Sequence, residues 1–121
     1  MPDATSASFE LMALSPLDGR YAARLAPLRA LLSEAGFMLH RVQVEVQWLI
    51  ALSDAGLPEL PPFSDEARRF LRALVERFDE AQAARIKAIE RVTNHDVKAV
   101  EYYLKEAVRD VPELARAGEF I

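Results

Sequence analysis

The fold class of this chain turns on residues 41–48, which read Arg41-Val42-Gln43-Val44-Glu45-Val46-Gln47-Trp48. Polar and apolar residues alternate here, as is typical of a β-strand. A helix would instead gather on one face the residues Met38, Val42, Val46, Leu49, Ile50 and Ser53. No turn signal lies between Gly36 and Gly56, and a lone strand would have no partner. We therefore predict a helix that begins at Ser33-Glu34, runs to about Ala55 and stops at Gly56.

Helical patterns continue on both sides of this segment. Ser64 is followed by two acidic residues, which is typical of an N-cap and the first turn of a helix. Proline and Asp-Gly predict a turn over 15–21. The other expected elements are a loose arm over 1–13, an amphipathic stretch over 27–32, a linker over 57–62, a helix over 64–78 that continues helical over 79–90, and a helix over 96–109. Together they predict an all-α domain of four to five helices.

Composition excludes several classes of function. The 121 residues contain no cysteine, so disulfide scaffolds, thiolate metal sites and cysteine nucleophiles are excluded. The only histidines are His40 and His95, too few for a His-rich metal centre. A net charge of −4 argues against a protein that coats nucleic acid. Neither a basic export signal nor ~18 uninterrupted apolar residues occur, so we expect a cytoplasmic protein with no membrane or nucleic-acid partner.

The first candidate site is the turn Asp18-Gly19-Arg20-Tyr21. An arginine fork presents paired donors that match a phosphate or carboxylate, and a tyrosine adds a donor or a stacking face. The plain alternative is a solvated turn, with Arg20 on the surface and Tyr21 packed on the first helix.

The second candidate site is Thr93-Asn94-His95-Asp96-Val97, which opens a helix. Free N–H groups and the positive end of the helix dipole favour an anion there. His95 is suited to donate to that anion or to act as an acid or base. Asp96 is suited to orient the imidazole or to accept a hydroxyl proton. The plain alternative is a capping cluster without a ligand.

Three other features have simpler interpretations. His40 is expected to pack or face solvent in mid-helix, and Trp48 is expected in the core. The basic run Arg68, Arg69 and Arg72 is expected to form a solvated face paired with Glu66 and Glu76.

Three blocks of the sequence resemble the adenylosuccinate lyase family. Residues 87–102, Lys87-Ala88-Ile89-Glu90-Arg91-Val92-Thr93-Asn94-His95-Asp96-Val97-Lys98-Ala99-Val100-Glu101-Tyr102, resemble its signature in the form found in the enterobacterial-type branch. Residues 15–21 resemble that branch's N-terminal motif, and residues 41–49 resemble a third stretch of it. The blocks keep the family's order and compatible spacing, and they extend over most of the chain.

The resemblance implies an N-terminal helical domain of the fumarase/aspartase-like fold, occupying residues 1–121. Such enzymes are all-helical homotetramers with composite active sites. This family splits adenylosuccinate into AMP and fumarate, performs the matching step on the succinyl-carboxamide ribotide, and requires no metal or organic cofactor. Its central and C-terminal domains are absent from this chain. So are its general-acid histidine, its base serine and a Thr-Ser substrate-binding pair.

Carried over by motif, the resemblance implies substrate contacts from Arg20, Tyr21, Asn94, His95 and Asp96, with Arg20 at the phosphate and an auxiliary role for His95. One nucleotide is therefore expected to span Arg20 and His95 on one face of the domain. The chain alone is expected to be inactive and to expose an apolar patch where the central domain docks. Two other functions remain open: another fumarate-releasing lyase of the superfamily, such as one acting on argininosuccinate, or a ligand-free helical interaction module.

Overall fold

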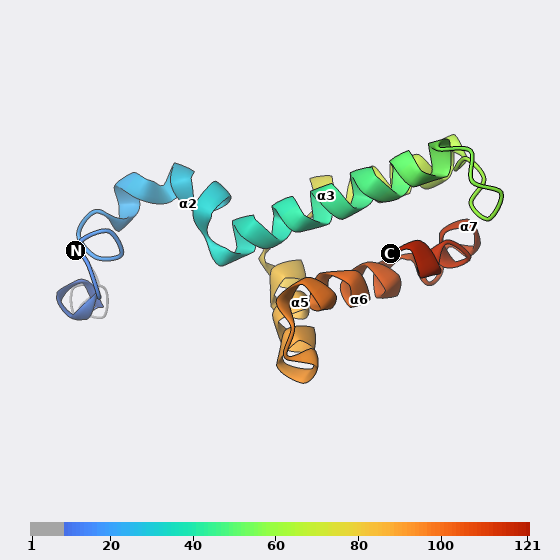
Figure 1. The fold of residues 1–121 in the computed structure, drawn as a ribbon. Coiled ribbons are helices and arrows are strands. Elements are labelled where there is room, and N and C mark those ends of the chain that lie inside the picture. Colours follow the sequence, from blue (N-terminus) through green and yellow to red (C-terminus); the bar gives the residue numbers. More distant parts are fainter. Residues whose placement is uncertain (1–8) are drawn as a thin grey trace. The chain divides into compact units, whose positions relative to one another are not determined.

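The computed structural model describes residues 9–121, and this part of the chain contains helices and no strand. Two compact units are present, one ending at Gly36 and the other formed by Phe37–Ile121. Figure 1 traces the elements along the chain. They are η1 (Ala22–Leu25), α2 (Ala26–Leu32), α3 (Glu34–Asp54), α4 (Asp65–Glu76), α5 (Glu80–Thr93), α6 (Asp96–Val108), α7 (Pro112–Ala115) and η2 (Gly118–Phe120). The all-α prediction is confirmed.

The ambiguous stretch 41–48 lies entirely within α3, as predicted. The side chains that the helical pattern placed inward are buried at Met38, Val42, Val46, Leu49 and Ser53. Val44 belongs to the apolar set only in the strand pattern, and it is 63% exposed. The alternation therefore arises because Val42 and Val46 lie on the buried face of the helix and Val44 lies on its exposed face.

Trp48 corrects one prediction, because it is 57% exposed instead of lying in the core. Its position on α3 is shared with Phe37 and Val44, which are also exposed. The spacing of these three residues, seven and then four, places them on one helical face, away from the buried stripe. Size and apolarity alone predicted the wrong location.

The start of α4 is confirmed in detail. Ser64 Oγ accepts a hydrogen bond from the Ala67 N–H at 3.1 Å. The Ser64 N–H and hydroxyl both donate to the Glu113 carboxylate, each at 2.7 Å, which ties this cap to the start of α7. Arg68 departs from the expected pairing, because it lies against Asp54 of α3 with an Nη1–Oδ2 distance of 2.9 Å. Helical spacing predicts neighbours on the same helix, and this partner is on another one.

Helices α5 and α6 form the most extensive helix pair of the second unit. Asp79 caps α5 through a capping box with Gln82, a helix start that the sequence pattern did not separate from α4. Tyr103 of α6 meets Phe78 edge to face, with ring centroids 6.2 Å apart. The side chains with the deepest burial are Leu71, Ile86, Leu114, Val42, Val100, Val108 and Ser53.

The expected arm over 1–13 needs revision, because residues 9–12 are helical, while residues 1–8 lie outside the described part. The turn over 15–21 is confirmed. Within the described residues, no helix combines the length and apolarity needed to cross a membrane.

Candidate functional site

The turn before η1 is held by its own side chains. Asp18 Oδ1 accepts the Ser15 N–H at 2.8 Å, and Ser15 Oγ accepts the Leu17 N–H at 3.1 Å. The Ser15 N–H lowers the pKa of the Asp18 carboxyl. Gly19 is buried, and a Cβ at this position would lie 3.1 Å from the Glu10 carbonyl oxygen. The Asp-Gly pair therefore shapes the turn, which leaves the next two residues to face outward.

Arg20 and Tyr21 follow this turn and are both exposed. The Arg20 guanidinium lies over the Tyr21 ring, with Cζ 4.8 Å from the centroid, and Arg24 approaches the same ring at 5.9 Å. Arg20 also borders an open cleft of about 520 Å³ lined by Glu10, Leu11, Ala13, Leu14, Ser15 and Pro16. Two guanidinium groups therefore lie close to one aromatic ring, an arrangement that suits an anionic ligand.

The second candidate site is a two-residue connection between α5 and α6. Asn94 ends α5 in the left-handed conformation, with φ of 52°, and its N–H donates to the Glu90 carbonyl at 2.7 Å. Asparagine tolerates this conformation better than most residues. Thr93 Oγ1 lies 3.3 Å from the His95 nitrogen and 3.2 Å from its carbonyl oxygen. The chain therefore turns tightly, and α6 begins at Asp96.

His95 is the N-cap of α6, which fixes its chemistry. Its Nδ1 accepts the Lys98 N–H at 3.1 Å, so a neutral imidazole in this arrangement carries its proton on Nε2. The side chain is 63% exposed. His95 therefore presents an Nε2–H donor outward, while its other nitrogen is occupied by the helix.

Asp96 does not orient the His95 imidazole, which was one of the two roles expected for it from the sequence. The nearest approach is 4.0 Å between His95 Nδ1 and Asp96 Oδ1, and Nδ1 already accepts from Lys98. Asp96 Oδ1 accepts the Val97 N–H at 2.9 Å, and Oδ2 lies 2.9 Å from Arg41 Nη2. The Val97 N–H, followed by Arg41, lowers the pKa of Asp96. Asp96 therefore remains an anion and anchors the start of α6 to α3.

Helices α3 and α6 also bring Glu45 and Glu101 near each other. Glu45 and Val44 line a small hollow of about 220 Å³ with Phe37, His40, Arg41, Val97 and Val100. Partial burial, followed by the charge of Glu101, raises the pKa of Glu45. Ionised Glu45 therefore opposes folding at neutral pH, because the unfolded chain ionises more easily.

Glu45→Gln is expected to stabilise the 121-residue chain at neutral pH. A folded-state pKa above the unfolded one means that stability falls as the pH rises through that range, and glutamine removes this loss. The gain should be below ~1 kcal/mol, because water screens a partly exposed carboxylate. It should disappear as the pH falls below the ordinary glutamate pKa of 4.5. Urea unfolding of both chains at two pH values measures the difference, and an equal gain at both would contradict the assignment.

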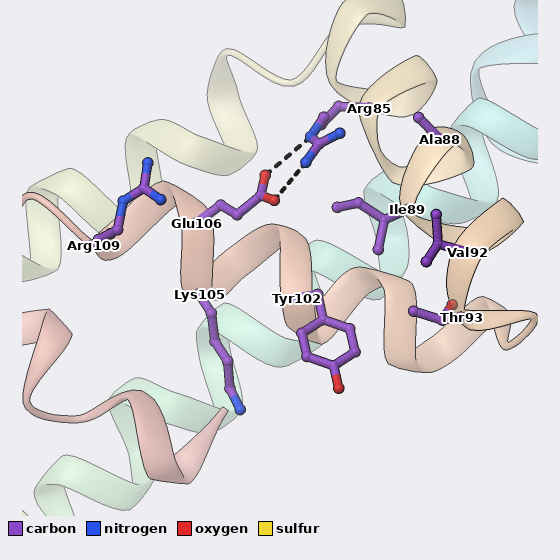
Figure 2. A pocket seen from close by; sticks show the side chains of 9 residues that line it. All are labelled: Arg85, Ala88, Ile89, Val92, Thr93, Tyr102, Lys105, Glu106 and Arg109. Atoms are coloured by element: carbon purple, nitrogen blue, oxygen red, sulfur yellow. Dashed lines mark hydrogen bonds and ion pairs between the residues drawn. The ribbon is translucent and has the colours of Figure 1, made fainter.

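A cleft of about 450 Å³ lies between α5 and α6, and Figure 2 shows its lining. Arg85 and Glu106 pair across it, with Nε and Oε2 3.0 Å apart. Lys105 and Tyr102 line the α6 side. Of the second candidate segment only Thr93 borders this cleft. The cleft is therefore separate from the polar groups of His95 and Asp96.

Known proteins are similar to this chain over most of its length. No protein-family model matches the chain. Over 112 residues the chain is 59% identical to the adenylosuccinate lyase of Haemophilus influenzae, 54% identical to that of Escherichia coli K12 and 53% identical to that of Vibrio cholerae. Each match covers 92% of this chain and 25% of the relative.

This chain is homologous to the N-terminal quarter of adenylosuccinate lyases. The resemblance inferred from the three sequence blocks is thereby confirmed, including its bacterial branch. The chain spans about a quarter of the length of the curated relatives that it matches.

The predicted site residues of this adenylosuccinate lyase homologue fall into two groups. Arg20 and Tyr21 lie in the first unit, while Asn94, His95 and Asp96 are adjacent in the second. A shared pocket for Arg20 and His95 stays a prediction. In the described part of the chain, no group of three or more potential metal ligands occurs.

Sequence reasoning missed Arg41, which is the partner of Asp96. Its role depends on a contact between α3 and α6, which the sequence pattern does not reveal. A mid-helix arginine beside a buried stripe gives no signal by itself.

Proposed function

We propose that this chain is the N-terminal, substrate-binding domain of an adenylosuccinate lyase. The full enzyme would cleave adenylosuccinate into AMP and fumarate, and the succinyl-carboxamide ribotide into its carboxamide and fumarate, in purine nucleotide biosynthesis. The observation that carries this proposal is 59% identity over 92% of the chain to a protein named adenylosuccinate lyase. The two polar segments, each suited to an anion, support it independently.

The proposed chemistry assigns different roles to the two segments. Arg20, beside Tyr21, would hold the nucleotide phosphate through charge-assisted hydrogen bonds. β-Elimination removes a proton from the carbon next to a carboxylate, and negative charge then builds on that carboxylate before the C–N bond breaks. The outward Nε2–H of His95 and the Asn94 amide supply donors for that charge. Asp96, already paired with Arg41, supports the segment and lines the site.

The acid histidine and base serine would come from the central parts of the enzyme, within a cytoplasmic homotetramer. Exposed Phe37, Val44 and Trp48 on α3 offer an apolar face on which those parts would pack. No cofactor or metal enters the proposal.

A segment exchange tests the function directly. Residues 1–121 replace the matching N-terminal quarter of the Escherichia coli relative, which is 54% identical over the aligned region. We expect the purified chimaera to cleave adenylosuccinate at a rate within about tenfold of its parent, because the donors at the site should be retained. The parent enzyme is the activity control, and circular dichroism with mass measurement verifies folding and assembly.

Two results would count against the proposal. A folded, tetrameric chimaera that cleaves argininosuccinate and leaves adenylosuccinate intact would favour a sister lyase. A folded chimaera without either activity, together with no heat when AMP is titrated into the 121-residue chain, would favour an interaction module.

A further inference from the structure

We propose that Arg41 is a positioning residue for the lyase site, holding the Asn94-His95-Asp96 segment in place from helix α3. The inference rests on the proposed function for its catalytic consequence, and on geometry alone for its structural part. Arg41 contacts no candidate substrate group directly. It acts through Asp96.

The side chain of Arg41 is itself held in place. Its guanidinium lies over the Phe37 ring, with Cζ 4.4 Å from the centroid, one helical turn earlier on α3. Its side chain is only 27% exposed, while the Asp96 side chain that it meets is 54% exposed. The ring therefore restricts an otherwise flexible side chain and directs Nη2 at Asp96 Oδ2, 2.9 Å away.

Asp96 connects Arg41 to the residues just before α6, Asn94 and His95. Asp96 is the first residue of α6, and its other oxygen holds the Val97 N–H. The adjacent His95 holds the Lys98 N–H through Nδ1. A shift of the Asp96 carboxylate would disturb the same helical turn that orients the imidazole.

The connection between α5 and α6 is held mainly by hydrogen bonds within these two helices. Asn94 and His95 are exposed, and within the described residues their hydrogen bonds join them to Glu90, Thr93, Lys98 and Ala99, all in α5 and α6. The Arg41–Asp96 ion pair joins this turn to α3. Arg41 therefore fixes the position of the His95 Nε2–H relative to helix α3.

A matched control is available in the same unit. Arg85 pairs with Glu106 between α5 and α6, and both side chains are about half exposed. This pair also joins two helices, yet it does not involve residues 94–96. Arg85→Ala therefore reports the general cost of losing an interhelical ion pair.

The structural arm of the test uses the 121-residue chain and needs no activity. Amide hydrogen exchange of Lys98 and the ¹⁵N shifts of the His95 imidazole are measured in the parent chain and in Arg41→Ala, Arg41→Lys and Arg85→Ala. We expect Arg41→Ala to speed Lys98 exchange at least several-fold and to shift the imidazole signals. Arg41→Lys should restore part of both, and Arg85→Ala should change neither. Equal responses to Arg41→Ala and Arg85→Ala would overturn the proposal.

The kinetic arm uses the chimaera described above. Arg41→Ala should lower kcat at least tenfold with little change in KM, because it misplaces a donor for developing charge and leaves the phosphate contact intact. Arg41→Lys should recover part of kcat, and Arg85→Ala should retain it. Adding Asp96→Asn to Arg41→Ala should cost little more than the worse single change, because both break one link. Fully additive losses, or unchanged kcat in Arg41→Ala, would overturn the catalytic part.

The two arms separate failure of this inference from failure of the proposed function. If the structural arm gives the expected result and the unmodified chimaera folds without lyase activity, the proposed function fails and the positioning contact stands. If the chimaera is active and Arg41→Ala matches Arg85→Ala in both arms, Arg41 has no positioning role.

Discussion

The 121-residue chain on its own is expected to leave adenylosuccinate uncleaved, whereas the chimaera that contains it should turn over. The family resemblance places the acid and base outside the part that matches this chain, and such groups typically contribute ~10²–10⁴-fold each. The candidate donors also remain in water, since Arg20 is exposed and the His95 side chain is 63% exposed. Hydrogen bonds to developing charge are weak in such a high-dielectric setting.

A spectrophotometric assay of adenylosuccinate loss at matched molar concentrations measures this difference. The parent Escherichia coli enzyme sets the scale, and circular dichroism verifies that the chain is helical. Turnover by the pure chain at a rate near that of the chimaera would show that this segment holds a complete site.

The fold was predictable where local rules act alone. The helix through residues 41–48 follows from the flanking glycines and the buried stripe, and the α4 start follows from the Ser64 cap. Trp48 was misplaced because indole size favours burial in general, while helix geometry puts this particular side chain on the face opposite Val46. Local rules therefore predict which elements form better than they predict what covers each face.

The sequence located the two candidate segments, but it predicted only part of their local geometry. Capping rules located the α6 start, yet they favour Ser, Thr, Asp or Asn as the cap, and here His95 takes that place through Nδ1. The Arg41–Asp96 contact depends on how α3 packs against α6, which no spacing along one helix encodes. A shared pocket for Arg20 and His95 likewise depends on contacts between segments far apart in sequence.

Substitutions at these last two residues should divide the kinetic effects between them in the active chimaera. Arg20→Ala should raise KM roughly 10–150-fold, the equivalent of about 1.5–3 kcal/mol for a lost charged hydrogen bond, with a smaller change in kcat. His95→Ala should instead lower kcat by roughly 10²–10³-fold with little change in KM, because it removes a donor needed mainly in the transition state. Steady-state kinetics on adenylosuccinate distinguish the two patterns.

His95→Ser separates the chemistry of this histidine from its structural role. Serine is a good N-cap, so this variant should keep the hydrogen bond to the Lys98 N–H and lose only the outward Nε2–H donor. It should therefore match His95→Ala in kcat while melting closer to the parent, because an alanine at the cap costs about 1 kcal/mol. If serine restored kcat as well as stability, His95 would act by capping α6 alone. If Arg20→Ala left KM unchanged, the phosphate would have to be held by another group, and the argument for one nucleotide spanning Arg20 and His95 would fail with it.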